Sequence, residues 1–185
     1  MIKTKKLTLC AMFCALIIVG AFIKIDIPLP MYTMHFTLQW LFVIMASLLL
    51  GKKIGTLSVI IYIILGLTGV PVFAAGGGPA YVLRPGFGFL LGFILAAFVI
   101  GFVLEKIKNK GVFSMIFAST IGMIVYYTIG AIYFYLIKNF YAGDQISFKV
   151  VIVTYCLITV IPDFILCVLA SYLSHRMKPI LTKMF

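Results

Sequence analysis

The chain alternates between long apolar runs and short segments that carry most of its charges, glycines and prolines. An apolar helix needs about 20 residues to cross a hydrocarbon core of about 30 Å. Six segments approach or reach that length: residues 7–23, 36–50, 54–73, 87–104, 112–137, and a last one between residues 150 and 180. The pattern predicts an all-α, polytopic membrane protein with six transmembrane helices, in which residues 1–185 form one integral-membrane domain.

The composition supports this interpretation. Hydrophobic residues make up 64% of the chain and charged residues 10%, whereas soluble domains carry about 25% charged residues. A net charge of +11 could indicate nucleic-acid binding in a soluble protein. Here the basic residues lie at the ends of the apolar runs, so we expect a membrane protein with no nucleic-acid partner.

The basic residues also predict an orientation. Only Lys24, Arg84, Lys138 and Lys149 fall on one face of the six-span topology. The other eleven fall on the opposite face: Lys3, Lys5, Lys6, Lys52, Lys53, Lys106, Lys108, Lys110, Arg176, Lys178 and Lys183. Because cytoplasmic loops are enriched in Lys and Arg, we expect a multi-pass protein of the cell membrane with both termini in the cytoplasm.

The last apolar segment allows two interpretations. A continuous span over residues 150–173 would place Pro162 and Asp163 near its middle. We favour a partly immersed extracytoplasmic helix over residues 150–161, followed by a last helix that Pro162 opens, because proline is tolerated at the first helical position. Asp163 would then lie at a helix start, where a carboxylate interacts favourably with the helix dipole.

A glycine-rich segment, AAGGGPAYVLRPGFG at residues 74–88, separates two of the spans. Its glycines and prolines oppose helix formation, and irregular backbone at membrane depth occurs only inside protein or beside a cavity. We therefore predict a re-entrant extracytoplasmic loop in which Gly77 offers backbone groups and Tyr81 stacks on a ligand ring. Arg84 would bind an anion with two parallel hydrogen bonds. A flexible external turn remains the alternative.

Polar groups in the other segments converge on the same end. Gln39 follows Thr37 at the start of the second span, and Asp163 belongs to the last. Gln39 could instead be an interfacial group, and Asp163 could cap its helix or pair with Arg84. Because polar groups that converge in an apolar bundle are typical of ligand sites, we predict a small-molecule site at the extracytoplasmic ends of the spans.

Other classes of function lack support in the sequence. No nucleophile with a base, paired carboxylates or P-loop motif is recognisable, so we expect neither an enzyme nor an ATPase. The four cysteines lie in apolar runs without the histidines of a zinc site, so we expect no metal and no cofactor. Ala11 and Ala15 form a small-residue stripe, as do Gly88, Gly92 and Ala96, and such stripes permit close helix packing.

Residues 36–101 contain TLQ, then GLTGVPVFA, then GGGPAY followed by P and G. In this order the motifs resemble the BioY family, the biotin-binding S components of energy-coupling factor (ECF) transporters. The resemblance implies that the protein captures biotin outside and works with a transmembrane coupling protein, EcfT, and two cytoplasmic ATPases. It also implies that Ala11 and Ala15 contact the coupling protein and that Asp163, in an IPD segment similar to the family's Pro-Gly-Asp, bonds the ureido ring of biotin.

Two positions depart from the family pattern. Leu166 stands where the family usually has a lysine for the biotin carboxylate, and Arg84 stands where a small residue usually precedes the loop proline. We hypothesise that Arg84 replaces the lysine as the carboxylate partner. The departures leave open a related carboxylate ligand such as lipoate, another small metabolite, or a solitary facilitator that needs no partner.

Overall fold

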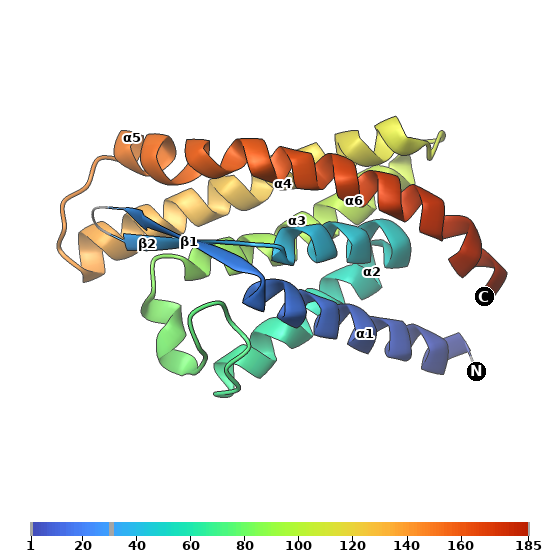
Figure 1. Ribbon diagram of the computed structural model, residues 1–185, viewed down its shortest axis with the longest axis horizontal. Coiled ribbons are helices and arrows are strands. Elements are labelled where there is room, and N and C mark those ends of the chain that lie inside the picture. Colours follow the sequence, from blue (N-terminus) through green and yellow to red (C-terminus); the bar gives the residue numbers. More distant parts are fainter. Residues whose placement is uncertain (1, 30–31, 185) are drawn as a thin grey trace.

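The computed structural model describes residues 2–29 and 32–184, which form a bundle of long helices with a small hairpin at one end (Figure 1). The side chains of Lys3 and Lys183, which entered the orientation argument, lie outside what it describes. The long helices are α1 (Ile2–Phe22), α2 (Gln39–Leu67), α3 (Phe87–Lys106), α4 (Val112–Leu136) and α6 (Leu157–Met184). The hairpin consists of β1 (Lys24–Leu29) and β2 (Tyr32–Thr37).

Helix α2 is two spans joined at a sharp reversal. Gly51 has φ 78° and ψ 174°, a conformation that is essentially restricted to glycine. Gln39 bonds Tyr62 through its Nε2 at 2.6 Å, although 23 residues of straight helix would extend about 34 Å. The two halves therefore lie antiparallel, and Gly55 packs so closely that a Cβ there would come within 2.8 Å of the Ser47 Cα.

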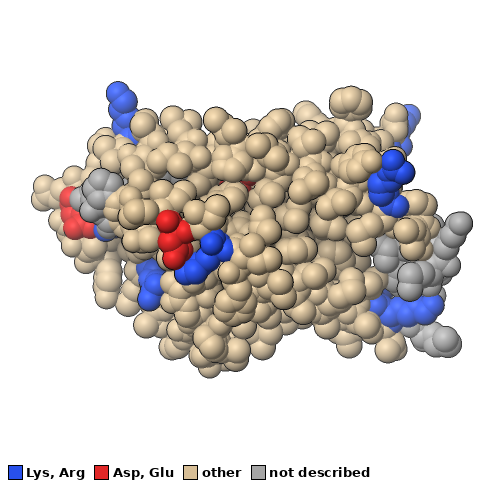
Figure 2. Space-filling model, in the orientation of Figure 1, with Lys and Arg blue, Asp and Glu red and all other residues tan. Residues whose placement is uncertain are grey.

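The prediction of six spans is confirmed when α2 is counted as two. By length and composition, five described helices can cross a membrane, and α2 is one of them. Both chain ends lie at one end of the bundle, and the hairpin and the connection after α2 lie at the other (Figure 1). On the face in Figure 2 the basic residues gather toward these two ends and leave a band without Lys or Arg between them.

The start of the last helix differs from our prediction. Helix α5 (Phe148–Val150), the π-helical segment η3 (Val151–Cys156) and α6 follow one another without a break, and Pro162 lies inside α6. The prediction that Pro162 opens a separate helix is therefore wrong. Proline is tolerated within membrane helices because neighbouring groups and local π-helical adjustments satisfy the freed backbone, and η3 ends at Cys156, six residues before Pro162.

The antiparallel β-hairpin was not predicted. Its register pairs Asp26 with His35 and Lys24 with Thr37 across the two strands. It joins α1 to α2, and the Leu38 amide donates to the carbonyl of Gly20 at 3.1 Å, which fixes the hairpin to the end of α1. β2 therefore lies directly before the buried first turn of α2.

Close contact between α3 and α4 confirms the role expected of the small-residue stripe. A Cβ on Gly88 would lie 2.3 Å from the Tyr133 Cβ, and one on Gly92 would lie 2.7 Å from the Tyr126 carbonyl oxygen. Ala96 is fully buried. Because this stripe brings the two backbones together, Tyr126 is placed beside the first half of α3, where the candidate site is found.

Candidate ligand-binding site

A cavity opens at the hairpin end of the bundle. It has an empty volume of about 770 Å³, part of which is open to solvent. Five residues of β2, the first turn of α2, the first half of α3 and parts of α4 and α6 line it, together with Ala74 and Tyr81 of the connection after α2. Mostly apolar walls with a few polar groups are typical of a small-molecule site.

Asp163 brings a carboxylate into this cavity from the second turn of α6. Its side chain is buried, with 3% of its surface exposed. Both Tyr126 and Tyr127 of α4 donate their hydroxyls to its Oδ2, the latter at 2.6 Å. Among the described residues none bonds Oδ1 or forms an ion pair with Asp163. Asp163 therefore neither caps a helix nor pairs with Arg84, and its Oδ1 is an acceptor that a ligand can use.

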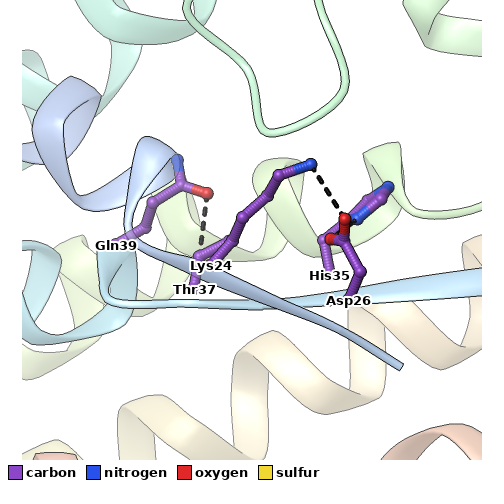
Figure 3. Close-up of polar contacts among 5 residues, drawn as sticks. All are labelled: Lys24, Asp26, His35, Thr37 and Gln39. Atoms are coloured by element: carbon purple, nitrogen blue, oxygen red, sulfur yellow. Dashed lines mark hydrogen bonds and ion pairs between the residues drawn. The ribbon is translucent and has the colours of Figure 1, made fainter.

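Gln39 is held in the cavity wall from both sides. It is 3% exposed, its Oε1 accepts from the Thr37 hydroxyl at 3.1 Å, and its Nε2 donates to the Tyr62 hydroxyl at 2.6 Å. Figure 3 shows Thr37 and Gln39 at the junction of β2 and α2. The side chain links the hairpin to the second half of α2, so its amide orientation is fixed before any ligand binds.

Three aromatic rings form an apolar wall beside Asp163. Trp40 stacks on Phe93 with ring centroids 5.6 Å apart, and Tyr126 lies 4.6 Å from Trp40 and 5.2 Å from Phe93. All three residues line the cavity. Such a wall favours a flat or fused ring of low polarity, because aromatic rings contribute large contact areas at little entropic cost.

The glycine-rich connection folds against the cavity through its non-glycine side chains. Phe73 is buried and contacts the Tyr81 ring at a centroid distance of 4.5 Å. The short 3-10 helix η1 (Pro79–Leu83) carries Tyr81 into the cavity lining, and burial raises the pKa of this tyrosine to about 12, so it is a neutral hydroxyl. Tyr81 therefore lines the cavity, and its stacking on a ligand ring stays a prediction.

Gly77 and Arg84 do not line the cavity in this structure. Gly77 is exposed, and a Cβ there would lie 2.3 Å from the carbonyl oxygen of Val70, so its role here is to permit close packing of the loop. Arg84 is exposed, with its guanidinium 5.0 Å from the centre of the Tyr81 ring. It lies at the rim of the site, next to a residue of the wall.

A cluster of three charged or titratable groups lies on the hairpin at the cavity mouth. Asp26 contacts His35 Nδ1 through Oδ1 at 2.5 Å and Lys24 through Oδ2 at 3.3 Å (Figure 3). The hydrogen bond from His35, aided by Lys24, holds the pKa of Asp26 below its ordinary value. His35 itself lines the cavity.

The structure therefore brings together Gln39, Tyr81 and Asp163 of the predicted site. Sequence reasoning missed Tyr126, Tyr127 and His35. Tyr126 and Tyr127 are adjacent in the middle of an apolar run and put hydroxyls at membrane depth, and this pattern could have indicated a polar site.

No group of three or more His, Cys, Asp or Glu residues that could bind a metal ion is found in the described part of the chain.

The fold and the cavity define a polytopic membrane protein with a small-molecule site at one end of its helical bundle. The chain belongs to the BioY family, whose model matches residues 1–183. A probable biotin transporter BioY of Lysinibacillus sphaericus is 40% identical over 175 residues, which cover 95% of this chain and 87% of the relative. The biotin transporter BioY of Thermotoga maritima is 43% identical over 143 residues, 76% of this chain and 78% of the relative.

A solved structure has the same fold. The S-component for biotin from an ECF-type ABC transporter, known from a crystal structure at 2.1 Å, superposes with a TM-score of 0.84 at 30% identity. The match covers 96% of this chain and 92% of that chain. The all-α membrane fold expected from the sequence is thus also the fold of this relative.

Proposed function

We propose that this protein is the biotin-binding S component of an ECF-type ABC importer, which captures biotin from outside the cell. The observation that carries the proposal is the buried Asp163 carboxylate, which lines an aromatic cavity and whose Oδ1 has no partner among the described residues. Membership of the BioY family and the names of the relatives support biotin as the ligand. Biotin has a cyclic urea that donates N–H groups, a fused thioether ring and a carboxylate tail.

The deep end of the cavity suits the bicyclic head of biotin. Asp163 Oδ1 would accept a ureido N–H, and a hydrogen bond to a charged acceptor contributes about 1.5–3 kcal/mol. Trp40 and Phe93 would pack against the fused rings, while Gln39 and Tyr81 border the same space. Gly77 would act by shaping the loop that carries Tyr81.

Arg84 is our proposed partner for the biotin carboxylate. Its guanidinium lies over Tyr81 at the rim, and a guanidinium can bind a carboxylate with two parallel hydrogen bonds. The buried Leu166 cannot supply this charge. We expect Arg84→Ala to weaken biotin binding about tenfold, the loss of one exposed charge-assisted contact. An unchanged affinity would rule out this role.

We further propose that both termini are cytoplasmic, so that the cavity faces outward. Delivery would then need EcfT and two cytoplasmic ATPases, since no P-loop occurs in this chain. Ala11 and Ala15 are both exposed on α1 and lie one turn apart on the same face. Such a stripe can accept a closely packed partner helix.

Two experiments test this function. In the first, unlabelled biotin or lipoate competes with radiolabelled biotin for binding to the purified protein. We expect biotin to displace the label at far lower concentration than lipoate. Equal displacement by the two compounds would reject the substrate assignment.

In the second, proteoliposomes receive the protein with or without the coupling protein and ATPases. We expect ATP-dependent uptake only with the partners, whereas equal uptake by the protein alone would indicate a solitary facilitator.

A further inference from the structure

The hairpin carries a charge arrangement that the proposed function does not yet use. Lys24 and Asp26 of β1 form an ion pair at 3.3 Å, and the same carboxylate bonds His35 of β2 at 2.5 Å. The lysine charge balances the aspartate charge. When the His35 imidazole is protonated, Lys24, Asp26 and His35 together have a net charge of about +1. Of these three residues, His35 is the one that lines the cavity.

The ring of His35 has one nitrogen available. Nδ1 is engaged by Asp26, and no described residue bonds Nε2. The side chain is 17% exposed, so it is partly shielded from water yet open to the cavity. In the imidazolium form both ring nitrogens are donors, and Asp26 fixes the ring so that Nε2 points away from the carboxylate it already contacts (Figure 3).

The two polar ends of the cavity differ in depth. Asp163 is 3% exposed, whereas His35 and its partner Asp26, with 17% and 48% of their side chains exposed, lie at the mouth. Among the described residues that line the cavity, His35 is the one with a basic side chain. The cavity therefore carries a carboxylate acceptor at its buried end and a basic side chain at its exposed end.

We infer that His35, held by Asp26, binds the carboxylate tail of the ligand and thereby selects for an anionic tail. This inference rests on the proposed function, because it takes the head to lie at Asp163. It adds a direct contact inside the cavity to the proposed contact with Arg84 at the rim. In this arrangement Lys24 neutralises the charge of Asp26, Asp26 orients the His35 ring, and His35 contacts the ligand.

The test compares biotin with biotinamide, which has the same head and a neutral tail, by titration of purified protein at pH 6.0. Wild type should bind biotin at least about tenfold more tightly than biotinamide, as expected for a charge-assisted contact. His35→Gln should lower this preference about tenfold, leave the part that Arg84 contributes, and keep wild-type affinity for biotinamide. His175→Gln, at an exposed position of α6, is the matched control and should behave as wild type.

Each outcome decides between interpretations. A His35→Gln variant that retains the full preference for biotin would overturn the inference, and so would one that loses biotin and biotinamide equally, since our account confines His35 to the tail. If wild type binds neither compound tightly, the proposed function itself fails. Asp26→Asn should reduce the preference part of the way, because it releases the ring without removing it.

Discussion

Asp163 is the residue on which ligand recognition depends most. Asp163→Asn keeps the size of the side chain but removes its charge and places an amide where one carboxylate oxygen stood. Because hydrogen bonds to a charged acceptor contribute about 1.5–3 kcal/mol, we expect biotin affinity to fall about 10- to 100-fold. Equilibrium binding of labelled biotin measures this. Asp144→Asn, which alters a pair with Lys138 outside the cavity, is the control and should bind normally; equal affinities for the two variants would contradict the assignment.

The Gln39–Tyr62 hydrogen bond belongs to stability as well as to the site. Tyr62→Phe keeps the ring, which is fully buried, but leaves Gln39 Nε2 without its acceptor. A buried donor without a partner costs about 1–3 kcal/mol, so the unfolding temperature of the detergent-solubilised protein should fall. Tyr141→Phe, at an exposed tyrosine, should leave it unchanged. If both variants melt like wild type, the bond contributes little to the fold.

Among the elements, α2 depends on a single residue for its reversal. Gly51→Ala places a side chain at φ 78° and ψ 174°, where non-glycine residues are strained by about 1–3 kcal/mol. A Cβ there meets only Glu105 Oε1, at 3.9 Å, so strain rather than collision is being tested. We expect a lower unfolding temperature than for Gly111→Ala, which has an ordinary φ of −74° and a contact no closer than 3.4 Å. Equal stability of the two variants would count against a strained hinge.

Helix positions could be read from the sequence largely because apolar runs between glycines and charges are a strong signal. The runs at residues 87–104 and 112–137 begin where α3 and α4 begin. The hairpin was not predicted because its two strands are short and β1 contains Pro28, a residue typical of loops. The helix start at Pro162 was predicted wrongly because proline usually interrupts a helix in water. In a membrane bundle, neighbouring groups can satisfy the backbone that proline leaves unpaired, so the helix continues.

The site could be predicted only in part for a related reason. Asp163 and Gln39 stood out as polar groups in apolar runs, and Tyr81 as a ring beside glycines. The contacts of Tyr127 and His35, however, depend on pairing across distant elements: Tyr127 meets a residue 36 positions away, and His35 meets its partner through the strand register. No periodicity in one segment reports such contacts.

At the scale of the whole molecule, one end holds the ligand cavity, and the exposed Ala11 and Ala15 lie near the middle of α1. Replacing both alanines by Trp should abolish co-purification with the coupling protein, because large side chains prevent close helix packing. Biotin binding by the isolated protein should stay unchanged, since neither residue lines the cavity. Leu95→Trp, at an exposed position of α3, is the control and should assemble normally. Assembly of the double variant at wild-type levels would place the partner surface elsewhere.

The central claim is that this bundle holds biotin tightly in its cavity. Isothermal titration of the purified wild-type protein with biotin and with lipoate measures it directly. We expect one biotin per protein with a Kd in the nanomolar range, about −12 kcal/mol, and much weaker binding of lipoate, which has no ureido group for Asp163. Absence of tight biotin binding, or equal affinity for lipoate, would contradict the account.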